Sequence, residues 1–205
     1  MCEASGMFPV DPDTGTYDAE MVSRFNARAA EHGYDIDVAA LLPEIVPAGE
    51  AAGELDGEGL HRLDASGTLQ GPIPLCPPEG DAGTGMVATA SVRKRTGNVS
   101  AGTSVFAMVV LEEKLRRVHT EIDQILTPDG SLVAMAHSNN CTSDFDAWAG
   151  RFAEAAGRLG HEVSRDEALA ALIPAALDGE ADAGGLLSYG YISGEHVTGF
   201  SEGRP

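Results

Sequence analysis

Apolar residues follow a helical spacing in two short segments near the amino end of the chain. Asp18 can cap the first helix, and a second helix over residues 38–42 stops at Pro43. The apolar face of the first helix comprises Met21, Val22, Phe25 and Ala29. Residues 1–8 show no start of an element. Loops rich in Gly and Glu are expected to run from Pro43 to Gly71.

The pattern changes after Gly71, where short apolar segments alternate with glycine-rich ones. Residues 72–76 predict a buried strand that leads toward Asp81, and residues 86–92 are small and apolar enough for a packed helix. Asp81 is therefore expected at the end of a strand, ahead of a helix. The segment between them contains a Gly83-Thr84 pair, which we interpret as a turn.

A hairpin is predicted next, with strands at 96–100 and 104–111. Its turn, Ala101-Gly102-Thr103, contains a glycine that can take a positive φ. A further strand is expected at 132–137. Residues 113–127 are ambiguous between helical and strand spacing, and we expect a helical turn followed by a strand.

Two helices are predicted in the last third of the chain. Ser143 can cap the first, whose apolar face is expected in the core through Trp148 and Phe152, and Ser164 begins a capping box for the second. Pro174 should kink or end that second helix. Strands in a meander followed by a helix are typical of the opening of a ribonuclease H-like domain of the α/β class, the unit that actin-type ATPases use twice.

Charge and composition narrow the classes of partner. The 205 residues include 32 Asp and Glu against 13 Lys and Arg, a formal net charge of −19, which argues against nucleic acid or an anionic membrane. Three widely separated cysteines indicate neither a disulfide framework nor a structural zinc site. No long apolar run or signal peptide is visible, so we expect a cytoplasmic protein with a small-molecule partner.

Asp81 and the two Gly-Thr pairs are the candidate chemistry. A carboxylate can accept a hydroxyl proton, and exposed N–H groups in Gly-Thr turns can hold phosphate oxygens, so Asp81 with Gly102 and Thr103 suits phosphoryl transfer. Each also has a simpler interpretation, as a helix cap or a plain hairpin turn. Lys94 and Lys114 lie in the same nearly neutral third of the chain, where a polyanionic ligand would be least disfavoured. Protection of a strand edge by these charges is the favoured interpretation.

Metal sites are weak alternatives. His137, Cys141 and Asp144 could suggest a zinc-dependent hydrolase, but they fit a polar loop between a strand and a helix better. The acidic stretch 178–182 lacks the pattern of a calcium-binding loop. We assign no metal ligands.

Four segments resemble the FGGY family of carbohydrate kinases. Cys2-Glu3-Ala4-Ser5-Gly6 is similar to the family's Ser-Asp-Ala-Ser-Gly passage, and Pro78-Glu79-Gly80-Asp81 resembles the run that ends in its catalytic Asp. Ser100-Ala101-Gly102-Thr103-Ser104 is similar to its phosphate turn, and the passage from Leu186 to Glu195 resembles its Pro-Tyr-Leu-x-Gly-Glu-Arg segment. Glu3 and His196 depart from the family's usual Asp and Arg, which leaves the sugar and the local loop shapes open.

The resemblance implies a partial ribonuclease H-like fold, as in actin, sugar kinases and Hsp70 ATPases. Residues 1–92 would be the end of the first lobe and residues 93–205 the start of the second. Family members are about twice as long or more, and the chain lacks the family's amino-terminal phosphate loop and late adenine-binding segment, so it looks like a central fragment that is inactive alone.

The implied function is ATP-dependent phosphorylation of a sugar or polyol, and a ketopentose such as xylulose is the expected substrate. Asp81 would contact the substrate and act as general base, Gly102 and Thr103 would contact nucleotide phosphates, and Mg²⁺ would neutralise their charge. A homodimer is one assembly open to such a protein. The alternative is a non-catalytic, actin-like nucleotide-binding or interaction module.

Overall fold

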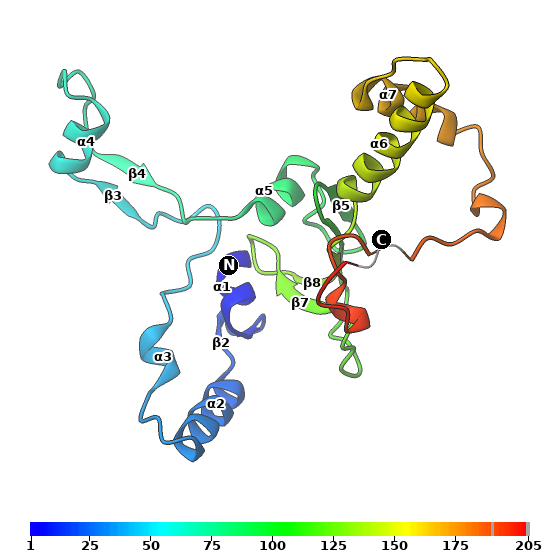
Figure 1. Ribbon diagram of the computed structural model, residues 1–205. Coiled ribbons are helices and arrows are strands. Elements are labelled where there is room, and N and C mark those ends of the chain that lie inside the picture. Colours follow the sequence, from blue (N-terminus) through cyan, green and yellow to red (C-terminus); the bar gives the residue numbers. More distant parts are fainter. Residues whose placement is uncertain (190, 204–205) are drawn as a thin grey trace. The chain divides into compact units, whose positions relative to one another are not determined.

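The computed structural model describes residues 1–189 and 191–203, and these form two compact units that interleave along the chain. The first unit comprises 1–98 and 108–135, and the second comprises 99–107 and the residues from 136 onward. Each unit is described by itself below (Figure 1).

The first half of the chain holds short elements with local pairing. They are α1 (Cys2–Met7), β1 (Val10–Asp11), β2 (Thr16–Tyr17), α2 (Ala19–Glu31), α3 (Val38–Leu41), β3 (Gly53–Leu55), α4 (Gly57–Leu63), β4 (Ile73–Leu75) and α5 (Asp81–Ala88). The predicted cap of α2 is confirmed, because the Asp18 carboxylate accepts a hydrogen bond from the Met21 amide at 2.9 Å. α3 ends before Pro43, also as predicted.

Three expectations for this half were wrong. Residues 1–8 contain α1, and the segment expected to be loop holds β3 and α4, which is capped by Asp56. The helix expected at 86–92 begins earlier, at Asp81. Its first turn forms in spite of its glycines, because the Thr84 amide donates to the carbonyl of Gly80 at 3.0 Å.

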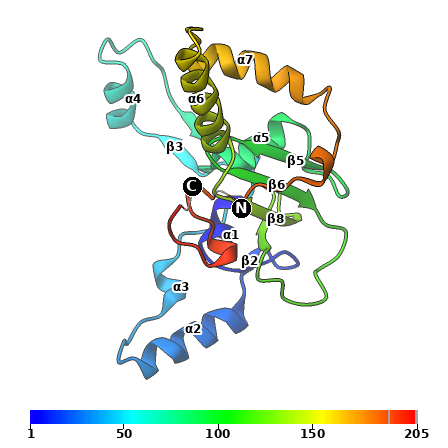
Figure 2. The ribbon, with the colours of Figure 1, turned by 45° about the vertical axis from the view of Figure 1, so that its right-hand side comes forward.

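A four-stranded sheet occupies the middle of the chain, in the order β5-β6-β8-β7. Its strands are β5 (Gly97–Ala101), β6 (Val105–Val110), β7 (Asp123–Leu126) and β8 (Leu132–Ser138). Figure 2 shows β5, β6 and β8 side by side. The predicted hairpin and the strand at 132–137 are confirmed. β7 pairs antiparallel with β8, with Asp123 opposite Met135.

The helical turn expected within 113–127 is absent from that described segment, which bends and turns before β7 begins. A strand forms there rather than a helix because Ile125 and Leu126 become buried at the end of β7, at 8% and 1% exposure. The core of the first unit is built from large side chains of this kind. Its most buried members are Met86, Met108, Val110, Leu126 and Val133.

The second unit is built around α6 (Thr142–Arg158) and α7 (Arg165–Ala176), which pack against each other (Figure 1). Ser164 forms both bonds of the predicted capping box of α7, and Pro174 lies two residues before its end. The expected Ser143 cap of α6 is wrong, because α6 starts at Thr142 after an N-cap residue, Cys141, whose side chain makes no capping bond.

The aromatic face of α6 was also misplaced by the sequence pattern. Trp148 and Phe152 are 51% and 52% exposed, whereas the buried residues of α6 and α7 are Ala149 and Ala168. The fold therefore buries small residues of these two helices and leaves the aromatic face of α6 about half exposed. Two short 3₁₀ helices, Ala183–Gly185 and His196–Thr198, follow.

Candidate active site

Asp81 is the first residue of α5, and its side chain is exposed. The carboxylate makes no hydrogen bond within the described residues, so it is available to a ligand. The backbone around it is ordered by Thr84, whose hydroxyl donates to the carbonyl of Gly80 at 2.9 Å. A free carboxylate on a fixed helix start is the geometry that a general base needs.

Two glutamates hold the loop that leads into Asp81. The Glu3 carboxylate accepts a hydrogen bond from the Gly80 amide at 3.0 Å, and the Glu3 amide donates to the Glu79 carboxylate at 3.2 Å. A Cβ at Gly80 would overlap the Glu3 carboxylate, and one at Gly83 would lie 3.0 Å from the Glu79 side chain. The glycines are therefore required for close approach of these carboxylates, rather than for binding phosphate.

The first Gly-Thr pair is consequently not a turn. Gly83 is buried and Thr84 lies within α5, where its amide is already bonded to Gly80. That part of the sequence interpretation was wrong. Glu3 and Glu79 were not predicted as supports, although both lie within the passages that carry the family resemblance.

Cys2 lies beside these glutamates and is 4% exposed. Burial, together with the negative charges of Glu79 and Glu3, raises the pKa of its thiol to about 12. The thiol of Cys2 and the carboxylates of Glu3 and Glu79 lie within 4.8 Å of one another, but the thiol is protonated at neutral pH. Since metals bind the thiolate, Cys2 is better suited to packing than to ligation.

The second Gly-Thr pair does lie in a turn, between β5 and β6, and both Gly102 and Thr103 are exposed. The turn is closed by a hydrogen bond from the Gly102 amide to the carbonyl of Ser104 at 2.8 Å. Gly102 does not take the positive φ that a glycine allows at this position. Within the described residues the amide and hydroxyl of Thr103 make no hydrogen bond, which leaves two donors for a ligand.

The start of α6 lies against this turn. The amide of Thr142, the first residue of α6, donates to the carbonyl of Gly102 at 3.0 Å. A helix amino terminus carries partial positive charge and favours anions nearby. Asp144 in the first turn of α6 balances part of that charge.

The predicted residues thus fall into two groups. Asp81 belongs to the first compact unit, and Gly102 and Thr103 belong to the second. Each group keeps its local support within its own unit, through Glu3 for Asp81 and through Thr142 for the turn.

The two lysines do not add free positive charge for a ligand. Lys114 pairs with Asp13 at 2.8 Å and with Asp11 at 3.6 Å, which raises its pKa, and Lys94 reaches the carbonyl of Glu112 at 3.5 Å. These contacts agree with the simpler interpretation, in which the lysines serve local structure.

His137 and Cys141 are likewise occupied by structure. The ring of His137 stacks on Phe106 with centroids 4.4 Å apart, and Cys141 precedes α6. Within residues 1–189 and 191–203, neither residue belongs to a group of side chains spaced to hold a metal ion.

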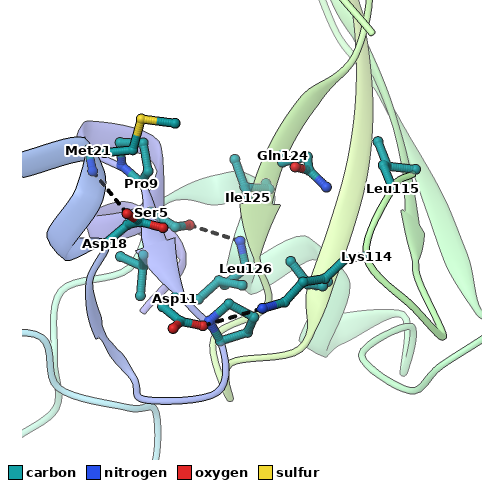
Figure 3. A pocket seen from close by; sticks show the side chains of 13 residues that line it. Ser5, Pro9, Asp11, Asp18, Met21, Lys114, Leu115, Gln124, Ile125 and Leu126 are labelled. Carbon is teal, nitrogen blue, oxygen red and sulfur yellow. Dashed lines mark hydrogen bonds and ion pairs between the residues drawn. The ribbon is translucent and has the colours of Figure 1, made fainter. Parts of the chain in front are cut away.

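A cavity of about 360 Å³ lies in the first unit between α1, the β1 segment, α2 and β7 (Figure 3). Its walls are largely apolar, and the Asp11–Lys114 ion pair lies on one side. Neither Asp81 nor the Gly102-Thr103 turn lines it. The cavity is therefore separate from the candidate chemistry. None of the helices in the described ranges combines the length and apolar character needed to cross a membrane.

Solved structures identify the fold. The chain matches the crystal structure of xylulose kinase from Rhodospirillum rubrum with a TM-score of 0.61 at 18% identity, over 89% of this chain and 33% of that one. It matches that of xylulose kinase from Bifidobacterium adolescentis with a TM-score of 0.59 at 20% identity, over 98% of this chain and 36% of that one. The fold is thus part of the ribonuclease H-like fold of sugar kinases, and the chain spans about a third of these structures' length.

A sequence-family model gives the narrower assignment. Residues 97–205 match the C-terminal domain of the FGGY family of carbohydrate kinases, so the chain belongs to that family. No curated protein matches the chain in sequence.

Proposed function

We propose that this chain is part of an ATP-dependent carbohydrate kinase in which Asp81 is the general base. The observation that carries the proposal is the exposed, unpaired Asp81 carboxylate at the start of α5, on a loop fixed by Glu3. In this role Asp81 contacts the sugar, accepts the proton of a hydroxyl, and so lets its oxygen attack the terminal phosphate of ATP. A carboxylate oxygen that accepts no other hydrogen bond is free to take that proton.

The Gly102-Thr103 turn is the proposed contact for nucleotide phosphates. The amide and hydroxyl of Thr103 supply the donors, Gly102 leaves the turn open because a Cβ there would have only ordinary contacts, and α6 begins beside it. These features fit an anionic group. Bound MgATP supplies the phosphoryl group, with the metal neutralising the phosphate charge.

The proposed substrate is a ketopentose such as xylulose, because both similar structures are those of xylulose kinases. We further propose a lobe boundary near Arg93, which the start of the family match at residue 97 supports. A cytoplasmic location and a homodimer stay predictions, and light scattering of the complete protein tests the latter.

Substitution of Asp81 tests the proposal. In the complete protein, Asp81→Asn should lower kcat for sugar phosphorylation by about 10²- to 10⁴-fold, because the amide cannot accept the proton. The dissociation constant for ATP should change little. A near-normal kcat would remove Asp81 from the mechanism.

Thr103→Val is the matched test of the turn. Loss of the hydroxyl should raise the apparent KM for ATP by about tenfold, as expected for one hydrogen bond to a charged group, with the sugar KM unchanged. An unchanged KM for ATP would exclude the Thr103 hydroxyl as a phosphate contact.

A further inference from the structure

A buried glutamate in the second unit accepts hydrogen bonds from the loop between β8 and α6. Glu195 is 3% exposed, yet the sequence pattern gave it no role. One oxygen of its carboxylate accepts hydrogen bonds from the Ser138 hydroxyl at 2.6 Å, the Asn139 amide at 3.1 Å and the Asn140 side chain at 3.3 Å. A buried carboxylate is costly unless such donors compensate it, so this site is organised around the charge.

Asn140 ties the same loop to the residues before Glu195. Its side-chain amide donates to the carbonyl of Gly194 at 2.7 Å, and its oxygen accepts from the Ser193 amide at 2.9 Å. Both ends of the Asn140 side chain are therefore used. The segment 193–195 and the loop 138–140 form one hydrogen-bonded unit.

That loop runs directly into the support of the phosphate turn. β8 ends at Ser138, and α6 begins four residues later at Thr142, whose amide holds the carbonyl of Gly102. The N-cap residue of α6 has no side-chain bond of its own, so the position of its first turn depends on the preceding loop. Glu195 accepts hydrogen bonds from all three residues of loop 138–140.

We infer that Glu195 and Asn140 are positioning residues for the nucleotide: they hold loop 138–142, and through the Thr142 amide they set the Gly102-Thr103 turn. The inference rests on the proposed function for the identity of the ligand, a nucleoside phosphate. Neither residue touches the ligand. Their loss acts on nucleotide affinity and leaves the sugar unaffected.

The test measures the dissociation constant for MgADP by calorimetry, and the KM values for ATP and sugar, in the complete protein. Glu195→Ala and Asn140→Ala should each weaken MgADP binding by about tenfold, because the turn loses its fixed position. The sugar KM should stay within about twofold of normal. A purely structural role would lower stability without this split between the two substrates.

Conservative and control variants sharpen the result. Glu195→Gln keeps an oxygen to accept the same hydrogen bonds, so its MgADP affinity should return to within about threefold of normal. Glu154→Ala, on the exposed side of α6, is the matched control and should leave both substrates unaffected. If Glu195→Gln weakens MgADP binding as much as Glu195→Ala does, the hydrogen bonds of Glu195 do not position the Gly102-Thr103 turn.

If Glu195→Ala fails to fold, Ser138→Ala keeps the test decisive, because it removes the 2.6 Å bond to Glu195 and two 3.3 Å contacts with the Asn140 backbone, but no buried charge. It should weaken MgADP binding by about threefold. Unchanged affinity in folded Ser138→Ala and Asn140→Ala would overturn the inference. If the unmodified protein binds MgADP but phosphorylates no sugar, the proposed function fails while the affinities still test the role of Glu195; no MgADP binding at all overturns both.

Discussion

The loop before Asp81 and the β5–β6 hairpin, with Gly102-Thr103 in its turn, both contain glycines, but these glycines serve different purposes. In the loop, Gly80 and Gly83 make room for the carboxylates of Glu3 and Glu79. In the hairpin, Gly97 lies against the backbone of β6, while Gly102 has only open space and ordinary contacts. A Gly-Thr pair in sequence therefore does not by itself indicate a phosphate turn; what surrounds the glycine decides.

The hairpin offers the largest expected effect on stability. A Cβ at Gly97 would overlap the carbonyl of Met108, which cannot retreat without separating the strands. Gly97→Ala should lower the free energy of unfolding by about 2 kcal/mol or more. Gly102→Ala, in the same hairpin, should change it by less than about 0.5 kcal/mol. Equal urea midpoints for the two variants would contradict the contrast.

The next largest effect is expected for substitution of Glu3, which holds the loop before Asp81. Glu3→Ala removes the acceptor of the Gly80 amide and should lower kcat by about tenfold, because Asp81 loses its fixed backbone. Glu3→Gln retains an acceptor oxygen and should stay near normal. Steady-state kinetics of both variants in the complete protein check this, and a normal kcat for Glu3→Ala would show that the loop holds its shape without Glu3.

The pH dependence of the protein's stability tests the hydrogen bonds around Glu195. Burial alone would raise the pKa of Glu195, but the hydrogen bonds from Ser138, Asn140 and Asn139 outweigh it and hold the pKa below its ordinary 4.5. The ionised group thus stabilises the fold fully above pH 4.5, and this contribution is lost as the pH falls through the lowered value.

The thermal midpoint of the unmodified protein should therefore fall more steeply between about pH 5 and about pH 3 than that of Glu195→Gln, which has no such proton to take up. Parallel curves from scanning calorimetry would show that Glu195 does not titrate differently in the folded state.

The smallest effect concerns the thiols. Cys2 is buried with a pKa raised to about 12, whereas Cys76 is exposed. A disulfide reagent should modify Cys76 first and leave Cys2 unmodified until the protein unfolds, because the thiolate is the reactive form. Mass spectrometry of the timed reaction, with Cys76→Ser as control, reads this directly. Equal rates for both cysteines would contradict the buried cluster at Cys2.

Local signals predicted much of the fold. The side chains of Asp18 and Ser164 accept hydrogen bonds from amides in the first turns of α2 and α7. The hairpin follows from two apolar strands on either side of a turn, so all these elements depend on residues close in sequence. The exposed aromatic face of α6 could not be predicted, because no local pattern shows which face of a helix its neighbours will cover.

The candidate site, too, could be predicted from the sequence only in part. Asp81 and Thr103 could be selected from residue type and resemblance, but their supports could not, because Glu3 is 77 residues from Gly80 and Glu195 is 57 from Ser138. Contacts over such separations depend on the folded chain. The resemblance placed Glu3 and Glu195 in family passages without indicating what they bind.

The most direct test of the central claim is sugar-dependent release of ADP by the complete protein, measured with MgATP and a panel of ketoses and polyols. We expect at least one sugar, with a ketopentose first, to accelerate ADP release well above the rate without sugar. MgATP binding with no acceleration by any sugar would contradict it, and would leave a nucleotide-binding module of the same fold.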